Sequence, residues 1–458
     1  MLNYDDMYQY QIDTAVAIYR RTKLAAWLDC GLGKTIISLT AIKWLLRDKI
    51  ITAALVIGPK TVCENVWEQE KNAWSHTRDL RVSVIAGDAS NRLRKADEDA
   101  DIYVVSRDNI AWLSERFDGL RVSKTDMLVC DESTSFKHRN TQRWKSLCQK
   151  GKRKYKLIDR FKRVVLLSGT PASESYEGLW AQIYLLDAGA RLDTSITRFR
   201  AKYMVGRMIH NQLIYTDFKP GAIEEIDDRI KDLCISMQSE DYLQLPDKID
   251  IVRWTGYTPD TLYNKMKNNG VIAIDNIHIM AAEPATRYNK LRQICSGWIY
   301  DELAEEHYCN HYKEDTFKDL LEELRSENVL VYYQYDFERE FLMLEHGAEL
   351  LDTPDQQAKW NDGKIKVACA HPASIGYGNN IQHGGHVIIF YSLPLSYECY
   401  LQATKRLHRN GQKDAVKVIH LIGQGTVEEK IYSLLKEKKS ALLEHLMDAM
   451  NNNNNKLI

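Results

Sequence analysis

The sequence predicts an α/β protein made of two parallel-sheet lobes with a helical insertion between them. Over residues 1–190, short apolar runs alternate with helical patterns, which is typical of βα units around a parallel sheet. The alternation stops over 191–305, where long, charged helical patterns indicate a bridging insertion, and it resumes over 306–450. Residues 451–458 begin with a run of asparagines and predict a polar tail without a core of its own.

The expected strands are short apolar runs that end in turns or polar clusters. Open parallel sheets bind their ligands at the carboxyl ends of the strands, so functional residues are expected there. In the first lobe the runs are Leu24–Leu28, Ala53–Ile57, Ile102–Val105, Met127–Cys130 and Val164–Leu167. Later in the chain we expect strands at Ile249–Trp254, Val329–Tyr333, Lys366–Ala368, Val387–Tyr391 and Val416–Leu421, a solvated acidic helix over Asp301–Glu327 and a final helix over Val427–Met450.

The composition is that of a soluble globular protein, with 44% hydrophobic and 27% charged residues in 458. The net charge of -1 means that any site for a polyanion must be local. No apolar run approaches the roughly 20 residues that span a bilayer, and the acidic start does not resemble a signal peptide. None of the nine cysteines forms a CxxC pair, which disfavours zinc and disulfides. We therefore expect a cytoplasmic protein, in the host cytoplasm if it is viral, without a membrane partner.

A phosphate-binding loop is predicted between the strand Leu24–Leu28 and the helical pattern Ile36–Arg47. Glycines in such a loop let backbone N–H groups approach phosphates, and the helix N-terminus favours the anion. We predict that Lys34 binds the β- and γ-phosphate oxygens of ATP and that the Thr35 hydroxyl binds Mg²⁺. The predicted nucleotide-binding residues of this loop are Asp29, Cys30, Gly31, Leu32, Gly33, Lys34 and Thr35, with Leu28 in place of the usual first glycine.

An acidic pair, Asp131-Glu132, follows the strand Met127–Cys130. An Asp in this place suits Mg²⁺, and the adjacent Glu suits orienting and deprotonating the attacking water. A solvated strand end is the alternative, but the pair follows Lys34 in the order expected along a parallel sheet. The next strand ends in Ser168–Ala172, which is either a sensor of the nucleotide or an ordinary β-turn.

Two basic segments stand out. Gln402–Gln412 places Arg406 and Arg409 three residues apart, on one face of a helical turn. By itself this is a basic helix end, but guanidinium groups are also what a second lobe needs to stabilise a transferring phosphoryl group. Residues 137–163 hold twelve Lys or Arg and one acid, which fits a solvated basic face and a phosphate-backbone contact equally well.

In order along nearly the full chain, these motifs resemble those of the SWI/SNF-type ATPases of helicase superfamily two. Leu28–Thr35 resembles the family's DEMGLGKT loop, Asp131–Thr134 stands where the family has DEAH, and Leu167–Pro171 resembles LTGTP. Gln402–Gln412 follows the pattern QAxxRxxRxGQ without a break. Further similar segments are Tyr10-Gln11 (the N-terminal glutamine motif), Leu243–Pro246, Leu291–Cys295, Val329–Tyr335 (VLIFSQF), Gly376–Ile381 (GxGLNL) and Thr426–Glu429 (TVEE).

The resemblance implies two RecA-like lobes that close on ATP and Mg²⁺, with a nucleic acid lying across both. It implies that Gln11 contacts the adenine and that Thr35 and Asp131 hold the metal. The catalytic residues that it implies are Lys34, Glu132, Gln402, Arg406 and Arg409, with Arg409 as the arginine finger. The residues that it places near a nucleic-acid strand are Pro59, Lys60, Thr61, Ser106, Arg107 and Lys137. Contacts of this kind address phosphates rather than bases, so we expect little sequence specificity.

The favoured function is an ATP-driven translocase on double-stranded DNA, because this family typically follows a duplex without opening it. The alternatives are a strand-separating DNA or RNA helicase and an ATP-switched nucleic-acid-binding protein with little turnover. Ser133-Thr134 departs from the family's Ala-His, which bears on how the acidic motif is coupled to its surroundings. The compact chain suggests a bacterial or bacteriophage protein rather than a chromatin remodeller, and the sequence identifies no protein partner.

Overall fold

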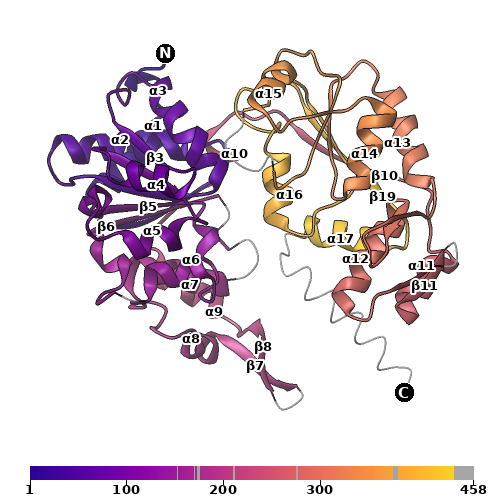
Figure 1. The fold of residues 1–458 in the computed structure, drawn as a ribbon, viewed down its shortest axis with the longest axis horizontal. Helices are drawn as coiled ribbons and strands as arrows, with labels where there is room; N and C mark the ends of the chain where they lie inside the picture. The colour runs from indigo at the N-terminus through magenta and orange to yellow at the C-terminus, as the bar shows by residue number, and fades with distance from the viewer. Residues whose placement is uncertain are drawn as a thin grey trace. The chain divides into compact units, whose positions relative to one another are not determined.

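The computed structural model describes residues 1–437 except 152, 170, 173–175, 210–211, 275–276 and 375–379. The chain folds into two compact units, Met1–Leu243 (unit 1) and Gln244–Ile458 (unit 2). In Figure 1, unit 1 runs from indigo to magenta and unit 2 continues to yellow. Each unit is built around its own sheet.

Unit 1 contains a seven-stranded sheet in the order β3-β4-β2-β5-β6-β1-β9, and all of its strand pairs are parallel. Its central strands are buried along their whole length, because helices cover both faces, and this explains their continuous apolar sequences. The strands are β1 Lys23–Leu28, β2 Ala54–Gly58, β3 Val82–Ile85, β4 Ile102–Ser106, β5 Met127–Asp131, β6 Arg163–Ser168 and β9 Cys234–Met237.

The helices of unit 1 follow the strands in sequence, as expected of βα units, and an antiparallel hairpin follows α8. In Figure 1, α1 and α2 lie on one side of the sheet and α6 and α7 on the other. These elements are α1 Gln9–Arg20, α2 Lys34–Arg47, α3 Trp67–Ala73, α4 Ala89–Ala96, α5 Ile110–Arg116, α6 Gln142–Cys148, α7 Glu177–Asp187, α8 Ile196–Tyr203, α9 Ala222–Ile230, α10 Ser239–Tyr242, the 3-10 turn η4 Ser133–Phe136, and the hairpin β7 Met204–Ile209 with β8 Gln212–Phe218.

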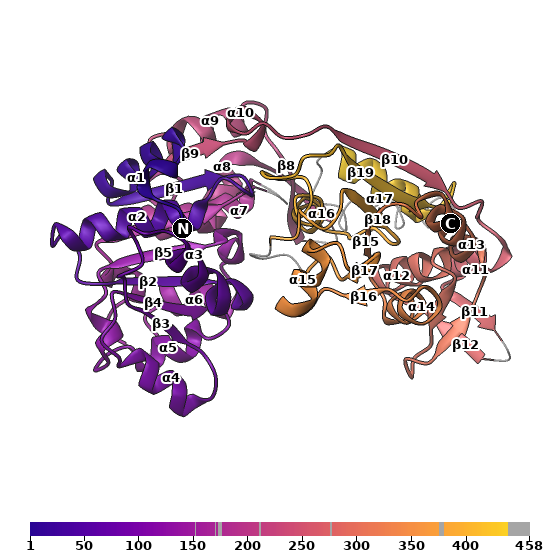
Figure 2. The ribbon, with the colours of Figure 1, turned by 90° about the horizontal axis from the view of Figure 1, so that it is seen from above.

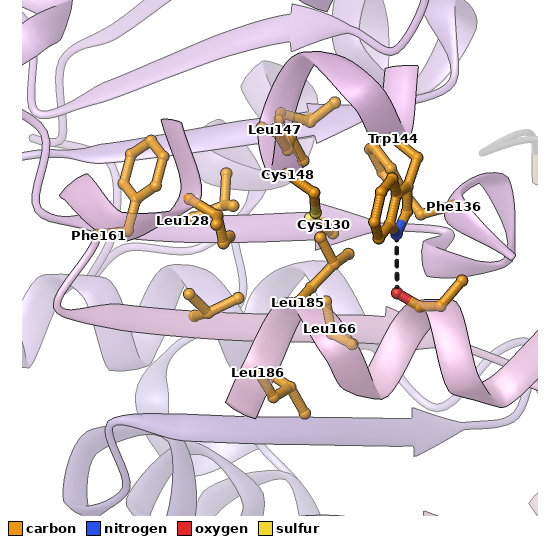
Figure 3. Packing of buried hydrophobic residues seen from close by; sticks show 14 of the residues in the cluster. Leu128, Cys130, Phe136, Trp144, Leu147, Cys148, Phe161, Leu166, Leu185 and Leu186 are labelled. Carbon is orange, nitrogen blue, oxygen red and sulfur yellow. Dashed lines mark hydrogen bonds between the residues drawn. The ribbon is translucent and has the colours of Figure 1, made fainter. Parts of the chain in front are cut away.

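Two helices close the core on one face of this sheet. Trp144 of α6 stacks on Trp180 of α7, with ring centroids 6.1 Å apart. The indole Nε1 of Trp144 donates to the carbonyl of Ala181 (3.0 Å), the bond dashed in Figure 3. Side chains of both helices pack on strands β5 and β6, and α7 is therefore held firmly on the sheet. The labelled members of this cluster include Leu128, Cys130, Leu147, Cys148, Leu166, Leu185 and Leu186.

Unit 2 contains a six-stranded, entirely parallel sheet in the order β10-β19-β18-β15-β17-β16. Together the two parallel sheets confirm the predicted two-lobe α/β fold class. The strands are β10 Lys248–Trp254, β15 Val329–Tyr332, β16 Glu349–Leu350, β17 Val367–Ala370, β18 Val387–Phe390 and β19 Val416–Ile422. The other elements are α11 Thr261–Asn269, α12 Pro284–Cys295, α13 Tyr312–Glu323, α14 Asp336–His346, α15 Pro354–Asn361, α16 Tyr397–Thr404, α17 Val427–Lys436, and the hairpins β11 Val271–Ile274 with β12 Ile277–Met280 and β13 Trp298–Tyr300 with β14 Glu306–Tyr308.

Every strand predicted from an apolar run is present, with bounds within two residues of the prediction. The stretch 191–305, predicted as one bridging insertion, is instead divided between the units after Leu243. It contributes β9 to the first sheet and β10 to the second, as Figure 2 shows. Both are edge strands with one neighbour and partly exposed side chains, so polar residues interrupt their apolar pattern; β10 was predicted as a strand and β9 was not.

Two other expectations need adjustment. The acidic stretch Asp301–Glu327 is helical only over α13, which buries Phe317 and Leu320 between its acids. Strand β14 lies in the stretch before this helix. The predicted final helix is present as α17 up to Lys436, while its continuation to Met450 and the tail lie outside the described residues. Within the described part of the chain, no helix combines the length and apolar content that crossing a bilayer needs.

A buried ion pair joins α13 to α17 in unit 2. Lys313 Nζ pairs with Glu428 Oε1, and the two side chains are 0% and 3% exposed. The other Glu428 oxygen accepts the N–H of Gly423 (3.0 Å). Lys313 also lies 3.5 Å from the Ser392 hydroxyl, which donates to Glu338 Oε1 at 2.5 Å. Glu428, a landmark of the sequence motif Thr426–Glu429, is thus part of the internal framework of unit 2.

Replacing one member of this pair leaves an uncompensated buried charge. We expect Glu428→Gln and Lys313→Met each to lower the free energy of unfolding by about 3–5 kcal/mol, and the double variant Lys313→Met/Glu428→Leu to recover most of the loss. Urea unfolding of the whole chain measures this. The exposed pair Lys359–Asp355 is the matched control, since Lys359→Met should cost less than about 1 kcal/mol. If the single variants lost no more free energy of unfolding than Lys359→Met does, the Lys313–Glu428 pair would not be a buried, mutually compensating ion pair.

His420 is buried in the second sheet of the protein. Its Nδ1 donates to the carbonyl of Ile251 (3.1 Å), its Nε2 lies 3.0 Å from the Tyr400 hydroxyl, and its ring stacks on Phe390 at 5.5 Å. Burial lowers the pKa of His420 to about 4. The unfolded chain therefore binds a proton at higher pH than the folded chain does, and acidification favours unfolding.

Because the pKa of His420 is lower in the folded state, its contribution to stability is lost as pH falls from about 6.5 to 4. We expect the free energy of unfolding of the wild type to fall more steeply over this window than that of His420→Asn, by up to about 1.4 kcal/mol per pH unit. Urea unfolding at a series of pH values gives both slopes. The surface variant His278→Asn should keep the wild-type slope, and equal slopes for His420→Asn and wild type would refute the prediction.

Candidate functional site

The predicted phosphate loop connects β1 to α2. Gly31 and Gly33 have φ of 91° and 79°, and α2 begins at Lys34 directly after them. The positive φ of Gly33 favours glycine, and a Cβ at this position would lie 2.4 Å from Gln11 Nε2, so the end of that side chain would have to move. The N-terminus of α2 presents unpaired backbone N–H groups at the loop, which suits an anion.

Lys34 extends from the first residue of α2 toward two acceptors. Its Nζ donates to the carbonyl of Leu28 (3.2 Å) and lies 3.9 Å from Glu132 Oε1, and its side chain is only 12% exposed. Burial acts to lower the pKa of Lys34, but the nearby Glu132 carboxylate, with smaller contributions from Cys30 and Asp131, outweighs it and raises the pKa. The ammonium group therefore stays charged.

Asp131 and Glu132 stand at the carboxyl end of β5, two strands from β1. The indole Nε1 of the completely buried Trp67 donates to Asp131 Oδ2 (3.1 Å), and the N–H of Glu132 donates to Asp131 Oδ1 (3.1 Å). Burial raises the pKa of Asp131 against the opposing effects of Lys34 and this indole. Glu132 itself has φ 52° and ψ 63°, the left-handed conformation that few residues other than glycine adopt.

These residues fit a nucleotide with its metal. The N-terminus of α2 and the Lys34 ammonium supply positive potential for phosphates, and Thr35 and Asp131 offer the oxygen ligands that Mg²⁺ prefers. Thr35 is half-buried in the first turn of α2. The structure thus brings together Lys34, Asp131 and Glu132 as predicted, and it adds Trp67, which no sequence motif singled out.

Two other residues predicted to bind the nucleotide, Gln11 and Asp29, form hydrogen bonds that hold the loop between β1 and α2 in place. The Gln11 amide donates to the carbonyl of Leu32 (3.2 Å) and accepts the N–H of Tyr8 (3.0 Å), so this side chain lies against the phosphate loop. The buried Asp29 carboxylate accepts the Ser239 hydroxyl of α10 (2.6 Å) and the N–H of Cys30 (2.9 Å). Contact of Gln11 with adenine stays a prediction.

The predicted nucleic-acid residues follow three adjacent strands, β4, β2 and β5, at the same edge of the sheet. Lys60 is exposed, and Arg107 and Lys137 are half-buried. Arg107 donates to the Ser135 hydroxyl (2.7 Å), and its backbone N–H donates to the carbonyl of Gly58 (2.7 Å), which ties the three loops together. Of the remaining candidates, Thr61 is half-buried, while Pro59 and Ser106 are buried.

Part of the basic stretch 137–163 serves the fold. Arg163 is buried and donates to the carbonyls of Ile18 and Arg21 at the end of α1, both at 2.9 Å. Arg153 donates to the carbonyl of Ser146 (2.8 Å). Charges of this kind hold helices in place and are not available to a phosphate backbone.

The basic motif in unit 2 differs in local structure from the prediction. Helix α16 ends at Thr404, so Gln402 is helical whereas Arg406 and Arg409 lie in the turns that follow and not on one helix face. At the end of the helix the carbonyl of Ala403 accepts the hydroxyl of Tyr332 (3.0 Å) and the N–H of Arg406 (3.2 Å), the shorter-range bond of a tightened last turn.

Both ends of this motif are held by the fold of unit 2. Gln402 Nε2 donates to Glu398 Oε1 (3.3 Å), and Arg406 is buried whereas Arg409 is half-buried. Gly411 has φ 92°, and the amide of Gln412 donates to the carbonyls of Gln382 and Gly385, both at 2.8 Å. Two motif segments, Thr170 and the residues 376–379, lie outside the described part of the chain.

This chain is similar to a known family and to several known proteins. The family model described as the SNF2-related domain matches residues 27–311, more than half of the chain. A putative protein, p41, of Acyrthosiphon pisum secondary endosymbiont phage 1 is 28% identical over 97% of this chain and 98% of its own length. The chromatin-remodeling factor PICKLE of Arabidopsis thaliana is 23% identical over 92% of this chain, and the DNA repair and recombination protein RAD54B of Gallus gallus is 21% identical over 88%.

The chain spans only 32% of the length of PICKLE and 49% of that of RAD54B. Among solved structures, the SWI2/SNF2 ATPase core of Sulfolobus solfataricus in complex with dsDNA is similar at 21% identity, with a TM-score of 0.43 over 97% of this chain and 93% of that one. The resemblance indicated by the sequence motifs is confirmed by the family match, and the chain belongs to the SNF2-related family of ATPases.

Proposed function

We propose that this protein is an ATP-driven motor that translocates along double-stranded DNA with little sequence specificity. The observation that carries the proposal is the meeting of Lys34 with the Asp131-Glu132 pair at one edge of the sheet in unit 1. A buried ammonium group 3.9 Å from a carboxylate, beside a glycine-lined helix N-terminus, suits the hydrolysis of a nucleoside triphosphate.

Each residue of unit 1 has a proposed part in hydrolysis. The Lys34 ammonium binds the negative charge of the β- and γ-phosphate oxygens, and the backbone of Gly31–Lys34 supplies further N–H donors. Thr35 and Asp131 would hold Mg²⁺, which would neutralise phosphate charge there. Glu132 orients the attacking water and accepts its proton.

Unit 2 supplies the arginines in this proposal. Arg409 stabilises the charge of the transferring phosphoryl group, and Arg406 and Gln402 support it. Arg409 is half-buried, whereas Arg406 is buried, and this difference favours Arg409 as the group that contacts a ligand. Turnover then requires both units.

The DNA part of the proposal rests on the loops after β2, β4 and β5. Lys60, Arg107 and Lys137 follow adjacent strands, so a row of cationic side chains lines this edge of unit 1. Lysine and arginine in such a row contact phosphates, which makes binding independent of sequence and dependent on salt. A DNA repair and recombination protein among the relatives agrees with a DNA substrate. The phage relative agrees with action on DNA in a bacterial host cytoplasm.

ATP turnover with and without duplex DNA tests the chemistry. We expect duplex DNA to stimulate the wild type, and Lys34→Ala, Glu132→Gln and Arg409→Ala each to lower stimulated turnover by about 100-fold or more. Surface variants of the same residue types are the controls: Lys43→Ala on α2, Glu115→Gln on α5 and Arg339→Ala on α14 should keep wild-type rates. Full stimulated turnover in Arg409→Ala would refute the assigned role of unit 2.

Strand displacement assays distinguish translocation from strand separation. We expect the wild type to displace the third strand of a DNA triplex in the presence of ATP and to leave a forked duplex intact, because a motor that follows a duplex pushes off an obstacle without opening base pairs. Glu132→Gln should do neither. Efficient fork unwinding would favour a strand-separating helicase, and DNA binding switched by ATP without turnover would favour a binding protein.

A further inference from the structure

The turn that follows Glu132 is anchored by a side chain that belongs to none of the sequence motifs, Gln182 of α7. The Ser133 hydroxyl donates to Gln182 Oε1 (2.8 Å), and both side chains are completely buried. Gln182 Nε2 donates to the carbonyl of Pro171 (2.8 Å) and lies 3.2 Å from the carbonyl of Gly178. One amide group therefore connects the acidic turn, the loop after β6 and helix α7.

Helix α7 is a firm support for this amide. The carbonyl of Ala181, the residue before Gln182, accepts the indole N–H of Trp144 inside the core shown in Figure 3. At Gly178, one turn earlier, α7 approaches the acidic turn so closely that a Cβ would lie 3.2 Å from the Cβ of Lys137. The helix is thus packed directly against the segment Ser133–Lys137.

The residue at the head of this turn needs such support. Glu132 is in the left-handed conformation, which a residue with a side chain keeps only where its neighbours hold it. Its N–H donates to Asp131 Oδ1 (3.1 Å), and its carbonyl accepts the N–H of Ser135 (3.0 Å). Both of these bonds are local, whereas two side-chain bonds fasten the turn to other parts of unit 1: Ser133 to Gln182 at its start, and Arg107 to Ser135 further along.

We propose that Gln182 is a positioning residue for Glu132. Through the Ser133 hydroxyl it fixes the turn and thereby keeps the Glu132 carboxylate directed at Lys34 and the water-binding position. Because the same amide binds Pro171, the loop after β6 is part of the same support. This inference rests on the proposed function, since it assigns Gln182 a role in ATP hydrolysis, and it accounts for the polar residue Ser133 next to the acidic pair.

Three variants test the link in the full-length protein. Gln182→Met keeps the length and approximate volume of the side chain but removes the amide, Ser133→Ala removes a single oxygen, and the double variant removes both partners. Ser146→Ala is the matched control, because Ser146 is a buried hydroxyl of the same unit that bonds to Gln142 in its own helix.

We expect each single variant to lower kcat for ATP about 10- to 100-fold while KM changes by less than about threefold, since the turn orients Glu132 and does not bind phosphate. The double variant should match Gln182→Met, because that variant already removes the bond between the two side chains as well as the bond to Pro171. A readout without nucleotide is hydrogen exchange: the backbone amides of Ser133–Lys137 should exchange faster in both single variants than in wild type or Ser146→Ala.

An unchanged kcat, effects that multiply in the double variant, or unchanged exchange of Ser133–Lys137 would each overturn the proposal. If Gln182→Met does not fold, Ser133→Ala decides by the same three measurements of kcat, KM and exchange. Failure of the proposed function gives a different result: wild-type turnover that DNA does not stimulate refutes the motor, while kcat measured without DNA still tests Gln182.

Discussion

Parallel pairing of the strands in unit 1 is the constraint on which the rest of the site depends. Because the seven strands run in one direction, all their carboxyl ends lie at one edge of the sheet. Leu28 and Asp131 end two of these strands, and this brings Lys34 within 3.9 Å of Glu132 although the residues are far apart in sequence. Burial on both faces makes the sheet rigid enough to hold that geometry.

Charge balance is the second requirement of this site. A buried ammonium group is costly without counter-charges, and Glu132, Asp131 and Asp29 provide them around Lys34. The carboxylates in turn are held by neutral donors: Trp67 binds Asp131, and Ser239 binds Asp29. Lys34 is the shared counter-charge of these carboxylates, so its replacement would leave all of them without it.

In unit 2 the motif Gln402–Gln412 contains residues that hold the fold together and residues proposed to act in ATP hydrolysis. Gln412 closes the motif by binding two backbone carbonyls of the loop that precedes β18, and Gly411 supplies a positive φ beside it. Glu428, in the helix α17 that follows strand β19, forms a buried ion pair with Lys313. The contacts of Gln412 fix the end of the segment that carries Arg406 and Arg409. Residues of one basic motif therefore have different roles, some holding the fold and some proposed to face a ligand.

The sequence by itself determined the fold class, the central strands, the glycine-rich loop before α2, the acidic pair and the basic motif. These follow from local patterns: continuous apolar runs, glycine spacing, and charges at the ends of strands. Tertiary structure alone decided that β9 and β10 are edge strands of two different sheets, that Arg406 and Arg409 lie beyond the end of α16, and that Trp67 and Gln182 support Asp131 and the turn after it. The physical reason is the same in each case. A buried hydrogen bond between distant segments, or a single neighbouring strand, leaves no periodic signal in the chain, because it depends on which segments packing brings together.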